Sequence, residues 1–129
     1  DIATNINLNT MSFIQWTNQN ENNDLLQISI GINPHKDDQW ASGKCGFKAL
    51  QYMALGIPAL VSPVGVNTII VEAGINGFIC KSDEDWERNI EQLILNRERL
   101  LKMSEMTRKK IVDNYSVKSN TDNFLSLFS

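Results

Sequence analysis

The sequence predicts an α/β domain built on a parallel sheet. Short apolar segments alternate with segments of helical periodicity up to residue 80, and only helical patterns follow. Because parallel strands need crossover connections, this alternation favours a parallel sheet covered by helices. The 129 residues, 42% of them hydrophobic and 21% charged, suit one globular domain over 1–129. Within it, 82–129 is predicted to be a helical C-terminal part.

Four segments are predicted to be strands. Residues 11–16 (MSFIQW) alternate and are rich in aromatic and β-branched side chains, which is typical of strands. Residues 28–34 (ISIGINP) end at Pro34, which cannot donate to a sheet. Residues 58–62 (PALVS) form a short buried strand, and 75–80 (INGFIC) a turn followed by a strand.

Helices are expected between these strands. Residues 18–26 form a polar start and a short helix, and 35–43 form a loop. A helix over 45–55 is predicted to end at Gly56 in a left-handed conformation, with Pro58 just beyond. Asn67 is predicted to cap a short helix that reaches Ala73 and is closed by Gly74. The apolar face expected for helix 45–55 consists of Phe47, Leu50, Met53 and Ala54.

The C-terminal part is predicted to hold three helices. Ser82 and Asp85 form a capping-box pattern at the start of the first. A second helix spans 97–114, and a last short one follows Ser116. The stripes expected to be apolar are Trp86, Ile90, Leu93 and Ile94 in the first, Leu100, Leu101, Met103, Ile111 and Val112 in the second, and Phe124, Leu125, Leu127 and Phe128 in the last.

Composition excludes several classes of function. The net charge of −3 gives no sign of the excess positive charge that nucleic-acid binding requires. No apolar run approaches the roughly 20 residues of a membrane span, and the polar start does not resemble a signal peptide. Cys45 and Cys80 stand in unrelated contexts, which favours reduced thiols in a cytoplasmic protein, and with His35 they are too few for a zinc site. We therefore expect no metal, and we interpret residues 83–85 (DED) as acids that favour a helix N-terminus.

The segment from Gly43 to Lys48 is the candidate binding site. Ligands bind at the carboxyl ends of the strands in such sheets, which places residues 34–48 and 62–67 on one rim. Lys44 and Lys48 lie four residues apart at the start of a helix, where unpaired N–H groups and the helix dipole attract anions. A bound phosphate would offset the conflict between these lysines and the dipole. The alternative is that both lysines are solvated and that Gly43 and Gly46 only shape a turn.

Gln51 follows Lys48 by about one helical turn and is expected to face the same candidate binding site. Its amide both donates and accepts hydrogen bonds, which suits a ribose diol. The alternative is an ordinary exposed glutamine.

The stretches GKCGFKALQYMALGIPALVSPVGVN and IIVEAGINGFICKSDEDW resemble the C-terminal domain of GT-B glycosyltransferases of group 1, also called family 4. The similarity runs from about Phe13 to Phe128. It implies a Rossmann-like, three-layer domain that binds a UDP- or GDP-sugar and transfers a hexose with retention, without a metal or other cofactor. It also implies that the chain is an incomplete C-terminal domain, without the N-terminal acceptor domain and the first strand and helix.

The resemblance also assigns donor-binding residues. The family has two glutamates separated by seven residues, and the matching positions here are Gly43 and Gln51. Lys44 is expected to neutralise the pyrophosphate, and the backbone at Cys45 and Gly46 to cradle it. The expected donor-binding set is Gly43, Lys44, Cys45, Gly46, Lys48, Gln51 and Asn67, the last with helix capping as its alternative role. No catalytic residue is assigned, although His35 lies in the loop that faces the cleft.

Further expectations concern partners and location. The acceptor is expected to be a sugar or a lipid-linked molecule bound by the other domain, so that this chain alone is inactive. The exposed sheet edge favours a homodimer. The resemblance implies a bacterial, cytoplasmic enzyme, with the inner face of the membrane as an alternative location. The competing function is a non-catalytic α/β nucleotide-binding or interaction module.

Overall fold

The computed structural model describes residues 10–44 and 46–128. Within them, three parallel strands form one sheet in the order β1-β2-β3. The strands are β1 (Gly31–Asn33), β2 (Ala59–Val61) and β3 (Gly77–Ile79). Leu60 of β2 is in register with Ile32 on one side and Phe78 on the other. The predicted α/β class with a parallel, Rossmann-like sheet is confirmed.

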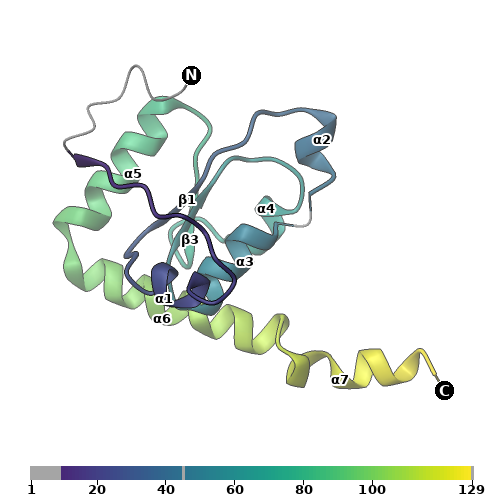
Figure 1. Ribbon diagram of the computed structural model, residues 1–129. Helices are drawn as coiled ribbons and strands as arrows, with labels where there is room; N and C mark the ends of the chain where they lie inside the picture. The colour runs from purple at the N-terminus through teal and green to yellow at the C-terminus, as the bar shows by residue number, and fades with distance from the viewer. Residues whose placement is uncertain (1–9, 45, 129) are drawn as a thin grey trace.

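Helices connect the strands and complete the chain. They are α1 (Glu21–Leu25), α2 (Gln39–Ser42), α3 (Phe47–Ala54), α4 (Asn67–Ile70), α5 (Asp83–Leu95), α6 (Arg97–Asn114) and α7 (Val117–Ser126). The connection from β1 to β2 runs through α2 and α3, and that from β2 to β3 through α4. Figure 1 shows α3 and α4 on one side of the strands and α5 on the other.

Two core clusters lie on opposite faces of β2, since successive strand residues point to opposite faces. One cluster holds Ala49, Met53, Ala59, Val61, Ile70, Val71 and Ile111. The other holds Leu60, Phe78, Cys80, Leu93 and Met103. All three β2 residues are fully buried, as expected for a central parallel strand. Helix α6 contributes Ile111 to one cluster and Met103 to the other.

The strand predicted over 11–16 is wrong. The described residues 10–17 contain no strand, and the side chain of Phe13 is 88% exposed. An alternating segment becomes a strand only where a neighbouring strand supplies hydrogen bonds and a covered face. No described strand pairs with residues 11–16.

The helix predicted over 45–55 is present as α3, but its predicted face is partly wrong. Met53 is fully buried as expected, and Ala49, one turn earlier, is buried with it. Phe47, in contrast, is 62% exposed. Phe47 is the first residue of α3 and lines a pocket rather than the core. Gly56 follows the helix with φ 73°, so the predicted left-handed end is confirmed.

The capping role predicted for Asn67 is wrong. Val66 is the N-cap residue of α4, and no side chain caps this helix end. The Asn67 side chain instead donates a 3.1 Å hydrogen bond to the Ser62 carbonyl, which ties α4 to the end of β2. The helix also ends at Ile70 rather than Ala73. Further upstream, the loop predicted over 35–43 contains α2, whose N-terminus is capped by Asp38.

The predicted C-terminal helices are confirmed as α5, α6 and α7. Ser82 accepts a hydrogen bond from the Asp85 amide, while the Asp85 carboxylate accepts one from the Lys81 amide. The stripes predicted for α5 and α6 are wrong at three positions, since Ile94, Leu101 and Val112 are exposed. The stripe predicted for the last helix is wrong throughout, since its four residues are all exposed: Phe124, Leu125, Leu127 and Phe128. Asn89 and Thr107 are buried in these helices instead.

Helix α7 has no buried residue among 117–126, all of which the structure describes. Figure 1 shows it at the end of α6, pointing away from the sheet. None of the helices in the described ranges is both long enough and apolar enough to cross a bilayer.

Candidate functional site

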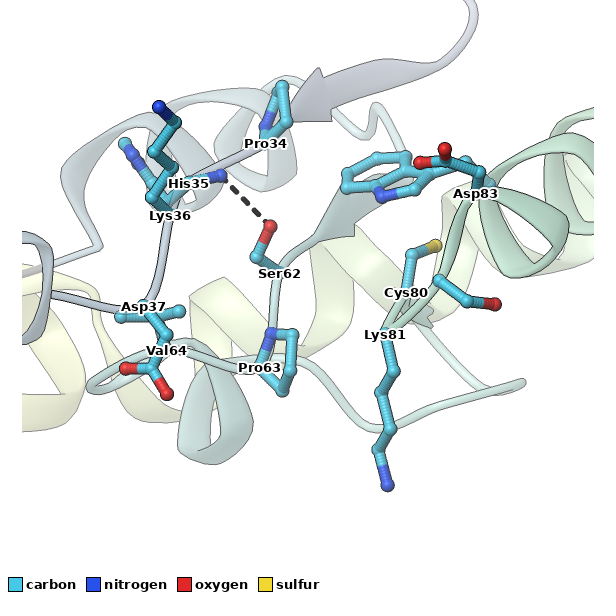
Figure 2. A pocket seen from close by; sticks show the side chains of 12 residues that line it. Pro34, His35, Lys36, Asp37, Ser62, Pro63, Val64, Cys80, Lys81 and Asp83 are labelled. Atoms are coloured by element: carbon cyan, nitrogen blue, oxygen red, sulfur yellow. Dashed lines mark hydrogen bonds between the residues drawn. The ribbon is translucent and has the colours of Figure 1, made fainter.

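A pocket of about 500 Å³ lies at the carboxyl ends of the three strands (Figure 2). Pro34 follows β1, Ser62 follows β2, and Cys80 follows β3, and all three line it. The remaining lining residues are His35, Lys36, Asp37, Pro63, Val64, Lys81, Ser82, Asp83 and Trp86. This edge is where open parallel sheets bind their ligands.

Hydrogen bonds fix the floor of this first pocket. The His35 amide donates to the Ser62 hydroxyl at 2.9 Å, which joins the ends of β1 and β2, as the dashed line in Figure 2 shows. At the end of β3, the Asn89 amide approaches the Cys80 sulfur at 3.6 Å. Burial raises the pKa of the Cys80 thiol. Cys80 therefore remains a protonated thiol at neutral pH and is a poor nucleophile.

A second pocket, of about 380 Å³, lies beside the first at the N-terminus of α3. Its lining residues are Asn33, His35, Gly43, Lys44, Gly46, Phe47 and Lys48. The structure thus brings Lys44 and Lys48 to one pocket, next to the end of β1. His35 lines both pockets, so the two are neighbours along this edge of the sheet.

Lys48 and Gln51 are joined to a carboxylate from a distant part of the chain. The Lys48 ammonium donates to Gln51 Oε1 at 3.2 Å, and Gln51 Nε2 donates to Glu21 Oε1 at 2.7 Å. The Lys48 and Glu21 charges are 3.8 Å apart. The pKa of Glu21 is lowered, chiefly by the Gln51 hydrogen bond, then by one from Trp16 and by the charge of Lys48.

Sequence reasoning missed Glu21. It lies 30 positions from Gln51, in a helix of five residues, and no local motif links the two. The available signal was weak: an acidic residue at the start of a short polar helix.

The two glycines of the loop have different roles. Gly46 is the N-cap residue of α3, with φ 67°, and a Cβ there would lie 2.5 Å from Ile70 Cδ1. Close packing against α4 therefore requires a glycine at position 46 whether or not a ligand binds. Gly43 has an ordinary φ of −79°, and the nearest described atom to an added Cβ is 3.6 Å away.

The other predicted donor-binding residues lie apart from the pocket lining. Gln51 reaches the second pocket only through Lys48. Asn67 is buried and is not among the described residues that line either pocket. Cys45, whose backbone was expected to help cradle a pyrophosphate, lies outside the described residues.

Apart from Asp37, the acidic side chains at the first pocket belong to the start of α5. Asp83, Glu84 and Asp85 all lie in its first turn, as the interpretation of DED as helix-start acids expects. Within residues 10–44 and 46–128, no three His, Cys, Asp or Glu side chains are grouped so as to hold a metal ion.

A parallel sheet covered by helices, with pockets at its carboxyl edge, defines a Rossmann-like α/β domain. The family model described as "Glycosyl transferases group 1" matches residues 1–110 of the chain. The chain therefore belongs to the group 1 glycosyl transferase family. A comparison with curated proteins gave no match.

Proposed function

We propose that this chain forms the donor-binding part of a retaining glycosyltransferase, which transfers a hexose from a UDP- or GDP-sugar to an acceptor. Membership of the family supports glycosyl transfer in general. The observation that carries the donor-binding role is the position of Lys44 and Lys48 in one pocket at the N-terminus of α3. A nucleotide diphosphate matches this pocket because it brings negative charge to two ammonium groups and a positive helix end.

Two neighbouring pockets that share His35 suit a ligand with a diphosphate in its middle. With the diphosphate beside Lys44 and Lys48, the attached sugar extends past His35 into the first pocket at the strand ends. The acceptor, a sugar or a lipid-linked molecule, is bound by another part of the full enzyme. No metal or other cofactor is part of this proposal.

The lysines would also support the reaction itself. Negative charge builds up on the departing nucleoside diphosphate as the bond between the anomeric carbon of the sugar and the diphosphate oxygen breaks. Positively charged and N–H groups fixed near that charge lower the barrier more than groups that must first reorient. Lys44, Lys48 and the first amides of α3 are the groups placed to do so.

Separate Lys44→Ala and Lys48→Ala variants test the proposal by calorimetric titration of the full chain with UDP and GDP. Each substitution is expected to weaken binding about ten- to a hundredfold, since a hydrogen bond to a charged group contributes about 1.5–3 kcal/mol. Lys118→Ala, which removes an exposed lysine of α7, is the matched control and should bind like the wild type. Unchanged affinity in both pocket variants would remove the diphosphate role.

A further inference from the structure

A third pocket, of about 470 Å³, is formed by α6 and the turn that leads into β3. The residues that line it are Gly74, Ile75, Arg99, Lys102, Met103 and Met106. Gly74 and Ile75 precede β3, whereas the two pockets described above follow the ends of strands. The third pocket therefore lies at the opposite end of β3 and shares no lining residue with the candidate donor site.

One part of the third pocket is apolar. Met103 is only 2% exposed and belongs to the core cluster of Phe78 and Leu93, so it closes the pocket on the inside. Ile75 and Met106 are 47% and 38% exposed and form its outer wall. A Cβ added at Gly74 would meet no described atom within 4 Å, so the turn does not fill the pocket. Flexible methionine side chains adapt readily to the shape of a hydrocarbon chain.

The other part of the third pocket is positively charged. Arg99 and Lys102 lie three residues apart on α6 and therefore on the same side of the helix. The Arg99 guanidinium carbon lies 5.5 Å from the centroid of the Phe78 ring, a cation–π contact that restrains it. Neither cation forms an ion pair with a carboxylate of the described residues. Arg99 also lies in the first turn of α6, where the helix dipole disfavours positive charge. An anion between the two side chains would offset both effects.

We propose that the third pocket binds a small amphipathic anion, with one phosphate or carboxylate group and a short hydrocarbon chain. The anionic group contacts Arg99 and Lys102, and the chain lies against Ile75, Met103 and Met106. An inorganic anion would leave the apolar wall uncovered, and a neutral apolar molecule would leave both cations without a partner. The volume suits a free small molecule, because such sites typically measure about 300–1,000 Å³. The inference does not depend on the proposed function, since the two sites share no residue.

Methionine methyl NMR tests the proposal, because the chain has only four methionines. The full chain is titrated with octyl phosphate below the concentration at which it forms micelles, and separately with octanol and inorganic phosphate. Octyl phosphate is expected to shift the Met103 and Met106 signals to saturation, at lower concentration than either of the other two probes. Met53, which is buried in the other core cluster, and Met11, which is exposed, should not shift.

Substitutions separate the two parts of the pocket. Arg99→Gln and Lys102→Gln should each weaken octyl phosphate binding about three- to tenfold, as the loss of an exposed charged contact implies, and leave any weak octanol binding unchanged. Ile75→Ala should weaken octyl phosphate and octanol alike. Arg97→Gln, which removes the same charge from an exposed position of α6 outside the pocket, is the control and should bind like the wild type. Thermal unfolding confirms that each variant is folded.

Four results would overturn the inference. Equal affinity for octyl phosphate and inorganic phosphate shows a bare anion site, and equal affinity for octyl phosphate and octanol shows a purely apolar one. Shifts of Met11 as large as those of Met103 and Met106 show unspecific association. Sedimentation with vesicles of phosphatidylcholine and phosphatidylglycerol, without any response to octyl phosphate, assigns these cations to a membrane surface instead.

Discussion

The Thr107 hydroxyl, in the middle of α6, donates a 2.6 Å hydrogen bond to the backbone carbonyl of Asn76 in the turn before β3. Both residues are fully buried. The Asn76 side chain in turn accepts a 2.8 Å hydrogen bond from the Glu72 amide, which closes the same turn. Two polar residues thus attach the last strand of the sheet to the longest helix.

We expect Thr107→Val to destabilise the protein by about 1–3 kcal/mol, because it leaves the buried Asn76 carbonyl without its partner while keeping the shape of the side chain. Urea unfolding followed by circular dichroism measures this change. The control is Thr121→Val on α7, where the hydroxyl bonds to the exposed Val117 carbonyl of its own helix. Equal effects of the two substitutions would contradict the structural role of Thr107.

Substitutions of the two loop glycines are expected to differ. Gly46→Ala places a methyl group against Ile70 at a backbone conformation that disfavours side chains, so it should destabilise by about 1–3 kcal/mol. Gly43→Ala has room and an ordinary backbone conformation, so it should leave the melting temperature nearly unchanged. A tolerated Gly46→Ala would show that α4 does not pack closely on this loop.

Alanine substitutions in α3 test which of its faces is buried. Met53→Ala should cost about 2–5 kcal/mol because it leaves a cavity in the core shared with α6. Phe47→Ala removes a larger side chain, yet it should cost far less because the ring is mostly exposed. The urea midpoints of the two variants are compared. A larger loss of stability in Phe47→Ala than in Met53→Ala would show that Phe47 is buried, as the sequence predicted.

Stability is expected to depend on the ionisation of Asp85. The Lys81 amide and then the Arg88 guanidinium hold the pKa of Asp85 below its ordinary value of 3.8. A carboxyl group whose pKa is depressed in the folded state stabilises that state above its unfolded pKa, and this contribution is lost as pH falls through the folded pKa. Asp85→Asn should therefore be less stable than the wild type near neutral pH, and the two should converge in acid. Urea unfolding from about pH 7 down to about pH 2 tests this, and a constant difference over that range would refute it.

Elements whose signal is local were predictable from the sequence. The strand around Ile32 and the helix headed by Ser82 and Asp85 carry their own apolar pattern and cap, and both are present. The segment containing Phe13 carries an equally clear alternation but no strand, because strand formation depends on a partner elsewhere in the chain. The exposed Phe47 shows a related limit: periodicity identifies a helix better than it identifies the face that is covered.

The candidate site was predictable only in part, for the same reason. Lys44 and Lys48 are close in sequence and lie together at one pocket. Glu21 reaches Gln51 across 30 positions, and only the packing of α1 near α3 brings them together. The Asn67 side chain bonds to the Ser62 carbonyl rather than to its own helix end, which no local propensity indicates.

Helix α6 supplies a side chain to each of the two clusters that flank β2, Ile111 to one and Met103 to the other. A chain that is still being synthesised, and has not yet reached Arg97, lacks one wall of both clusters. Its strands would then present uncovered apolar side chains, a state in which proteins associate incorrectly. Both core clusters can therefore be completed only after α6 has emerged from the ribosome.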